Sequence, residues 1–215
     1  MLVKDRMTRD PVTVTPDTPV SEALNVMRQA AVRRMPVLDK RGRLVGIVAE
    51  KDLLYASPSP ATSLNVYEIG YLLSKLKIKE IMAKDVVTIT EDAPLEEAAR
   101  VMVDNTVSGL PVVRRDEVVG IITETDIFKA MLEMLGARDE GIRVTLHVED
   151  RPGVLSQIAG AIASIGGDIV TLGTFASGEG RHGVLVVKVC LVDQDALVKV
   201  LEEIESVKVV DVRTS

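Results

Sequence analysis

Gly46-Ile47-Val48-Ala49-Glu50-Lys51-Asp52 recurs further along the chain as Gly120-Ile121-Ile122-Thr123-Glu124-Thr125-Asp126. Each stretch is typical of an apolar strand that runs directly into an acidic helix start. Matches upstream of this stretch keep one register: Met7 with Met82, 12–15 with 87–90, Pro19 with Pro94, and Pro36-Val37 with Pro111-Val112. So many matches predict two copies of one folded unit, packed about a pseudo-twofold axis.

Each copy is expected to fold in the order β-α-β-β-α. The first helix begins at a proline followed by glutamate, and its apolar residues fall at helical spacing. In the first copy these residues are Val20, Ala23, Leu24 and Met27, and in the second Leu95, Ala98, Ala99 and Met102. Strands are expected at 12–14, 35–38 and 44–48, and again at 87–89, 110–113 and 118–122. A second helix begins near Glu50 and near Glu124.

The chain after the repeats has a different pattern. A polar, glycine-bounded stretch predicts a linker, and the residues beyond it predict the order β-α-β-β-α-β of a ferredoxin-like domain. The fold class is therefore α/β (α+β), with five parts along the chain. They are a first repeat (1–56), a linker with an amphipathic helix (57–79), a second repeat (80–135), a linker (136–141) and the ferredoxin-like domain (142–215).

The amphipathic helix of the first linker carries Val66, Ile69, Leu73 and Leu76 on one face. Two interpretations remain open for it. The helix can cover the repeat pair, or it can form a self-association surface.

Composition excludes several classes of function. The net charge of −6 and the scarcity of aromatic residues, 2% of the chain, argue against nucleic acid or an anionic membrane as a partner. No apolar run is long enough for a membrane span, and the single Cys190, expected to be buried, suits a reducing cytoplasm. His147 and His182 lack neighbours at ligand spacing, so no metal site is expected. No motif for a nucleophile or an acid–base pair is visible, which predicts a protein that is not an enzyme.

Thr123 and Asp126 stand where a strand opens into a helix, and two interpretations remain open for them. They can cap the helix, Asp126 answering Thr123 as in a capping box. They can also bind a ligand, because a carboxylate accepts two hydrogen bonds from a ribose diol and a helix N-terminus attracts phosphate.

The residues Gly120-Ile121-Ile122-Thr123-x-x-Asp126 resemble the adenosine-binding motif of CBS domains, and residues 1–135 resemble a complete CBS pair, or Bateman module. The resemblance implies two clefts that bind AMP, ADP, ATP or a related adenosyl ligand. It places Thr123, Asp126, Thr8, Val12, Arg33 and Arg34 in one nucleotide-binding cleft. It places Asp52, Val87, Ser108 and Gly109 in the other, which is expected to be weaker or empty because Ala49 replaces the hydroxyl residue and the arginine pair is missing.

Asp150-Arg151-Pro152-Gly153-Val154-Leu155 and the later Gly167-Asp168-Ile169 resemble an ACT domain over residues 142–215. A capping role for Asp150 and Pro152 stays open. The resemblance implies an amino-acid-type site made of Asp150, Pro152, Gly153, Val154, Leu155, Asp168 and Ile169. It also implies at least a homodimer with paired sheets. Asp168 stands where this family often has Asn, which leaves the ligand open.

The order CBS–CBS–ACT resembles the AcuB-like acetoin-utilisation proteins over essentially the whole chain. This resemblance implies a link to acetoin or related carbon metabolism. Together with the composition, the missing catalytic motifs and the CBS resemblance, it predicts a cytoplasmic, non-catalytic sensor of adenine nucleotide that requires no cofactor. The alternative is an adaptor that regulates a separate enzyme by contact, with ligands only stabilising it.

Overall fold

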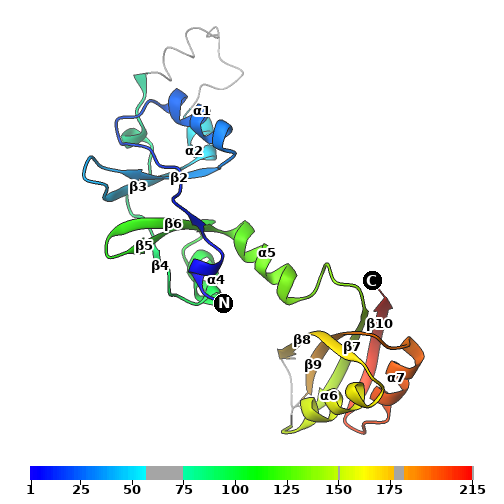
Figure 1. Ribbon diagram of the computed structural model, residues 1–215. Coiled ribbons are helices and arrows are strands. Elements are labelled where there is room, and N and C mark those ends of the chain that lie inside the picture. Colours follow the sequence, from blue (N-terminus) through cyan, green and yellow to red (C-terminus); the bar gives the residue numbers. More distant parts are fainter. Residues whose placement is uncertain (57–74, 150, 177–181, 215) are drawn as a thin grey trace. The chain divides into compact units, whose positions relative to one another are not determined.

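The computed structural model describes residues 1–56, 75–149, 151–176 and 182–214 (Figure 1). Within these ranges the chain divides into two compact units, Met1–Phe128 and Lys129–Ser215. The amphipathic helix expected around Val66 falls almost entirely on residues outside the described ranges. The predicted α+β fold class is confirmed, because helices and strands alternate in both units.

The first unit contains two copies of one arrangement, and the second copy has the full expected order β-α-β-β-α. The first copy contains α1 (Val20–Ala30), β2 (Arg34–Leu38), β3 (Leu44–Ala49) and α2 (Glu50–Tyr55). The second copy contains β4 (Ile89–Thr90), α4 (Leu95–Asp104), β5 (Gly109–Arg114), β6 (Glu117–Thr123) and α5 (Glu124–Met134), which runs on past the first unit. The strand expected at 12–14 is reduced to one bridge between Val14 and Val37.

The first helix of each copy forms because one of its faces is apolar. Helix α1 buries Val20, Ala23, Leu24 and Met27, as the spacing predicts. In α4 the buried residues are Leu95, Ala98 and Met102, while Ala99 is only partly buried. The two faces therefore supply corresponding parts of the cores of the two copies.

The short segments that precede the copies are exchanged between them. Strand β1 (Thr8–Arg9) pairs antiparallel with β6 of the second copy, in a sheet of order β1-β6-β5-β4. Conversely, the amide of Ile78 donates to the carbonyl of Thr18, and Ala83 bridges Ile47 of the first copy.

Two glycines make this exchange possible. A Cβ at Gly120 would lie 2.5 Å from the Sδ of Met7, and a Cβ at Gly46 would lie 2.5 Å from the Sδ of Met82. Each methionine therefore occupies the space that a glycine of the other copy leaves open.

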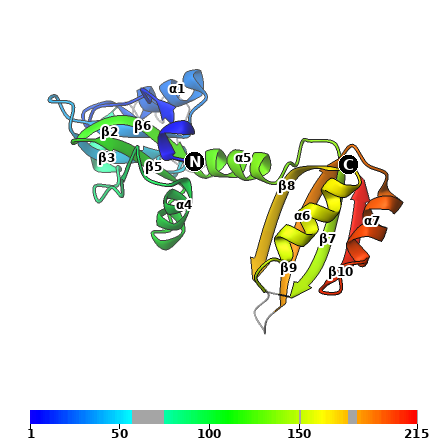
Figure 2. The same ribbon diagram turned by 60° about the horizontal axis from the view of Figure 1, so that its bottom comes forward.

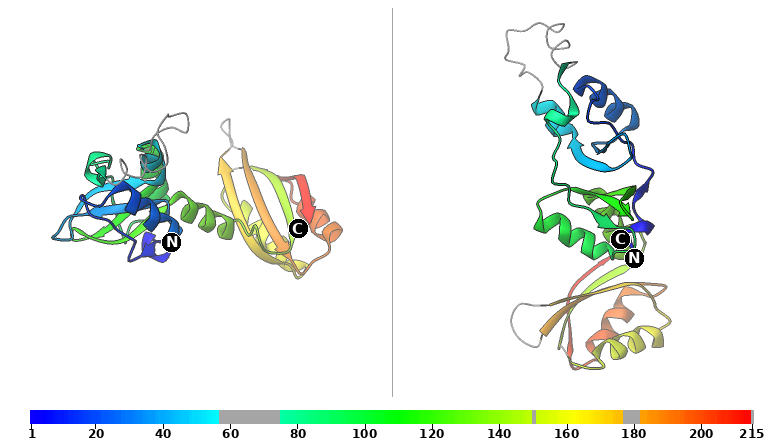
Figure 3. Two further views of the ribbon diagram at one scale, coloured as in Figure 1. Left: turned by 90° about the horizontal axis from the view of Figure 1, so that it is seen from above. Right: turned by 90° about the vertical axis from the view of Figure 1, so that its left-hand side faces the viewer.

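The second unit is a four-stranded antiparallel sheet of order β10-β7-β9-β8. Its elements are β7 (Ile142–Glu149), α6 (Val154–Ser164), β8 (Asp168–Ala176), β9 (His182–Cys190), α7 (Gln194–Glu202) and β10 (Val207–Thr214). Both helices lie on one face of the sheet (Figures 2 and 3). The core between them contains Ile158 and Ile162 of α6, Leu197 and Leu201 of α7, and Leu146 and Leu185 of the sheet. Cys190, at the end of β9, is partly exposed rather than buried as expected.

Candidate functional site

The junction between β6 and α5 holds the two residues singled out from the sequence. The amide and the hydroxyl of Thr123 both donate to Oδ2 of Asp126, at 2.9 Å and 2.7 Å. The capping interaction is thus present. Since both bonds end on Oδ2, the other carboxylate oxygen of Asp126 retains its acceptor capacity for a further donor.

A cavity of about 380 Å³ opens beside this junction. All six residues assigned to the first cleft line it, namely Thr8, Val12, Arg33, Arg34, Thr123 and Asp126. Thr8 reaches the cavity because β1 pairs with β6, where Thr8 lies opposite Ile121. The cavity therefore combines the exchanged first segment, the start of β2 and the β6–α5 junction.

Further lining residues were missed from the sequence: Asp10, Pro11, Ala30, Ala31, Val32, Ile121 and Thr125. Asp10 and Ala31 have left-handed backbones, with φ of 46° and 53°. Such values turn the chain sharply before Val12 and before Arg33. Glycine adopts the left-handed conformation far more readily than Asp or Ala, so the sequence did not predict a sharp turn at either of these two residues.

The two arginines of the cavity differ in their exposure to solvent. Arg33 is exposed, whereas Arg34 is partly buried. Burial lowers the pKa of Arg34, the nearby charges of Glu124 and Asp52 act in the opposite direction, and Arg33 lowers it further. Arginine stays charged at neutral pH in any of these surroundings. The cavity therefore offers two cations together with the carboxylates of Asp126 and Asp10.

The residues assigned to the second cleft are arranged differently. Oδ2 of Asp52 accepts from the amide of Ala49 at 3.0 Å, but Ala49 has no hydroxyl to match that of Thr123. Ser108 and Gly109 both contact Arg34, a residue of the first cleft. Val87 is partly buried. Two of the four assigned residues are thus engaged with the first cleft.

The residues assigned to the amino-acid-type site are divided between surface and core. Asp150 lies outside the described residues. Gly153 precedes α6 with a φ of 92°, and it is exposed together with Pro152 and Leu155. Val154 is buried in the core of the unit and Ile169 packs against it. Asp168 is exposed at the start of β8, opposite Cys190.

Arg151, which the sequence analysis did not assign to a site, forms the clearest polar contacts of this region. Its Nη2 donates to Gln157 Oε1 at 3.0 Å and to Ser206 Oγ at 2.9 Å. These bonds join the segment before α6 to α6 itself and to the turn before β10.

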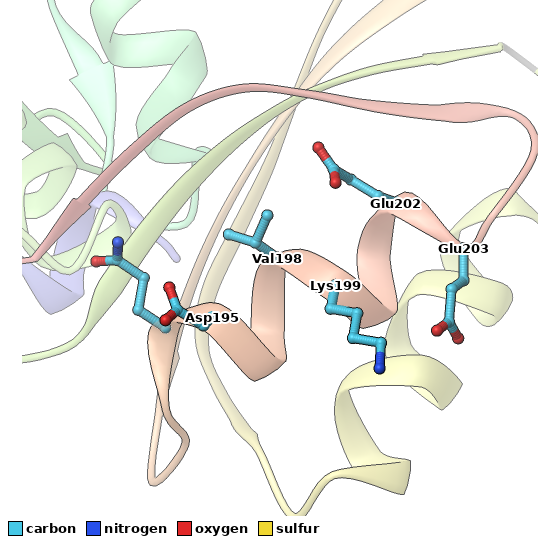
Figure 4. A pocket seen from close by; sticks show the side chains of 6 residues that line it. Asp195, Val198, Lys199, Glu202 and Glu203 are labelled. Carbon is cyan, nitrogen blue, oxygen red and sulfur yellow. The ribbon is translucent and has the colours of Figure 1, made fainter.

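A shallow hollow lies along the outer face of α7. Its lining includes Asp195, Lys199, Glu202 and Glu203. Figure 4 shows these side chains spread along the helix rather than converging on one point.

Across the described ranges, no group of three or more His, Cys, Asp or Glu residues is placed to hold a metal ion. Within the same ranges no helix is both long and apolar enough to cross a membrane.

Comparison with known families matches both units. The sequence matches the CBS domain family over residues 3–59 and 78–133, and the ACT domain family over residues 142–209. A CBS domain-containing protein of Dictyostelium discoideum is 32% identical over 136 residues, which cover 63% of this chain and 94% of the relative. Inosine-5'-monophosphate dehydrogenase of Methanocaldococcus jannaschii is 35% identical over 133 residues, 61% of this chain but only 24% of the enzyme.

Solved structures give a consistent result. The CBS domain pair of protein MJ0100, in complex with 5'-methylthioadenosine and S-adenosyl-L-methionine, matches with a TM-score of 0.52 and 30% identity, over 65% of this chain and 98% of that one. A putative acetoin utilization protein, AcuB, from Vibrio cholerae matches with a TM-score of 0.52 and 31% identity, over 65% and 96%. CBSX2 in complex with AMP matches with a TM-score of 0.50 and 29% identity, over 61% and 96%.

Proposed function

The chain belongs to the CBS-domain family, with a CBS pair followed by an ACT domain, and we propose that it is a regulatory protein that binds an adenosyl ligand in the first cleft. One observation carries the proposal: the Asp126 carboxylate, held by Thr123, shares a cavity with Arg33 and Arg34. The ligands named for the similar structures of MJ0100 and CBSX2 share the adenosyl group, which supports this class of ligand.

Each part of such a ligand has a partner of suitable chemistry in the cavity. The free oxygen of Asp126 accepts from a ribose hydroxyl, and Thr8 supplies a further polar group. Val12, 36% exposed, offers apolar surface to an adenine ring. Arg33 and Arg34 offer guanidinium groups to phosphate, which they can bind through two parallel hydrogen bonds.

The proposal assigns regulation, and no catalysis, to this chain. The ligand favours one packing of the two repeats over another, and a ligand can shift such an equilibrium only by its differential affinity for the two packings.

The proposal places the protein in the cytoplasm, where a lone Cys190 stays reduced, and gives it a role in acetoin or related carbon metabolism. The similarity to the AcuB structure supports that role. Incubation of the protein with ATP, followed by chromatography, tests the assignment of no catalysis. Turnover of ATP would contradict it.

The binding test is calorimetry with adenosine and AMP on the wild-type protein and two matched variants. Asp126→Asn removes the charge from the first cleft, and Asp52→Asn makes the same change at the equivalent position of the other repeat. We expect Asp126→Asn to lower the affinity for both ligands roughly tenfold or more, and Asp52→Asn to change these affinities little. Unchanged affinity in Asp126→Asn would show that the cleft assignment is wrong.

We further propose that the ACT domain forms a homodimer through its sheet. Strand β8 is an edge strand of the described sheet, and Leu172 and Phe175 on it are 39% and 51% exposed. An exposed edge with apolar side chains favours pairing with a second chain. Multi-angle light scattering should give twice the chain mass of 23.3 kDa, and Phe175→Lys should shift the protein toward the monomer. A wild-type monomer, with and without ligand, would overturn this proposal.

A further inference from the structure

Arg34 reaches out of its own repeat. It is the first residue of β2 in the first repeat, yet its Nη2 donates to the hydroxyl of Ser108, just before β5 of the second repeat. Arg34 also lines the cavity that contains Asp126. A single side chain therefore connects the wall of the first cleft with a residue that the sequence analysis assigned to the second.

Gly109 supplies the space for this arrangement. A Cβ at position 109 would lie 3.1 Å from Cδ of Arg34 and 3.4 Å from the carbonyl oxygen of Ile122. The distance to the carbonyl is an ordinary van der Waals contact, whereas the distance to Cδ is tight, so a methyl group at 109 would require Arg34 to shift by a few tenths of an ångström. In the alignment of the repeats, Gly109 stands at the position of Arg34 itself. The second repeat thus has no side chain at the position from which the first repeat extends Arg34.

The bond to Ser108 leaves most of the guanidinium available. Arginine has five N–H donors in a fixed planar fork, and Ser108 accepts from one of them. A flexible arginine loses conformational entropy when it is ordered around a phosphate, whereas a pre-ordered one has already lost it. Ser108 on one side and Gly109 on the other restrict the guanidinium of Arg34 before any ligand arrives.

Arg33 provides the contrast within the same cavity. Its side chain is exposed, and no described residue forms an ion pair with it. An exposed, mobile cation attracts an anion mainly through long-range charge, which salt screens. Arg34 is partly buried and held by a neighbour, so it binds with defined geometry.

We infer that Ser108 and Gly109 act on the first cleft as positioning residues: they hold Arg34 for the phosphate of the ligand and so set the preference of that cleft for phosphorylated over unphosphorylated adenosine. This inference rests on the proposed function, because it assumes that the first cleft binds the adenosyl group. It also reassigns both residues from the second cleft to the first.

The test compares two ligands that differ only by one phosphate. Calorimetry measures the affinities of AMP and adenosine for the wild-type protein, Ser108→Ala, Ser108→Thr, Gly109→Ala and Arg34→Gln, and the ratio of the two affinities reports on the phosphate alone. We expect the wild-type protein to bind AMP more tightly, and Ser108→Ala to reduce the ratio roughly five- to tenfold while adenosine affinity stays the same. Gly109→Ala should act in the same direction, and Ser108→Thr, which keeps the hydroxyl, should retain most of the ratio.

Two controls complete the test. At high salt, where the charge of Arg33 is screened, Arg34→Gln should bring the ratio close to one, and adding Ser108→Ala to Arg34→Gln should then have no further effect, because Arg34 and Ser108 act as one unit. Arg33→Gln should reduce the ratio chiefly at low salt.

The outcomes separate the two proposals. A ratio that Ser108→Ala leaves unchanged, or a wild-type protein without preference for AMP, would overturn the inference while adenosine binding still supports the proposed function. Wild-type protein that binds neither ligand would overturn both. Circular dichroism checks the folding of each variant, and Ser108→Ala, which removes only a hydroxyl group, still tests the inference if Arg34→Gln fails to fold.

Discussion

The ammonium of Lys188 donates a hydrogen bond of 3.0 Å to the carbonyl oxygen of Gly136. Lys188 lies on β9, between β7 and β8, and it is only 5% exposed. A second bond goes to the carbonyl of Asp139. Gly136 has a left-handed backbone, with φ of 58°, in the turn that follows α5. A buried lysine therefore fastens the segment leading into β7 onto the sheet, and its charge is met by two carbonyl oxygens.

Replacing this lysine tests how much the segment depends on it. We expect Lys188→Met to lower the free energy of unfolding by about 1–3 kcal/mol, because two carbonyl groups lose their donor while an unbranched apolar side chain of similar bulk is kept. Urea denaturation measures the change. Lys199→Met, on the exposed face of α7, is the matched control and should cost less than about 0.5 kcal/mol. Equal losses in both variants would contradict the assignment.

The exchanged segments predict a pair of glycine variants with different effects on binding. Gly120→Ala and Gly46→Ala each place a methyl group against a methionine Sδ and a backbone carbonyl at 3.0 Å. Each should destabilise the protein by about 1–3 kcal/mol in thermal or urea unfolding. Since Gly120 packs against Met7 and Thr8, only Gly120→Ala should also weaken adenosine binding. A similar loss of binding in both variants would argue against a specific role of β1.

A stabilising variant tests the difference between Thr123 of the second repeat and Ala49, its counterpart in the first. Ala49→Thr supplies the hydroxyl that Asp52 lacks, in the geometry that Thr123 has with Asp126. We expect the free energy of unfolding to rise by roughly 0.5–1.5 kcal/mol from the added hydrogen bond. Ala49→Val, which has the same shape without the hydroxyl, should show no such gain. If Val stabilises as much as Thr, packing rather than the hydrogen bond explains the effect.

Acid should destabilise the first unit through its ion-paired carboxylates. Hydrogen bonds from Arg114 hold the pKa of Glu91 below its ordinary value of 4.5, although desolvation opposes the shift. A carboxylate with a lowered folded-state pKa stabilises the fold above its unfolded pKa, and this stabilisation is lost as the pH falls through the lowered value. Unfolding curves between about pH 6 and pH 3 should show the decline. The decline should be smaller in Glu91→Gln than in Glu96→Gln, an exposed control on α4, and equal profiles would refute the prediction.

The repeat predicted much of the fold, because strand and helix periodicities are local properties of the sequence. The buried faces of α1 and the capping bond of Asp126 follow directly from residue spacing. The pairing of β1 with β6 does not, since antiparallel pairing over more than a hundred residues leaves no mark in the local pattern. For the same reason the strand expected at 12–14 was wrong: its alternating residues suit a strand, but Val14 alone finds a partner there.

The resemblance to a CBS pair predicted the candidate residues, including the six that line the first cleft. It placed Ser108 and Gly109 in the other cleft, at the positions equivalent to Arg33 and Arg34. The structure places both next to the side chain of Arg34, and Ser108 accepts a hydrogen bond from its guanidinium. A contact between side chains of different repeats depends on the folded packing, so the sequence located these residues without showing the contact.

Because Met7 and Met82 are exchanged between the copies, neither copy is complete without the other. A single copy on its own would leave the strand that carries its glycine without its neighbour from the other copy, and it would leave the space beside that glycine unfilled. A chain with one copy is therefore expected to form a dimer that exchanges these segments. The present chain meets the same requirement within one polypeptide.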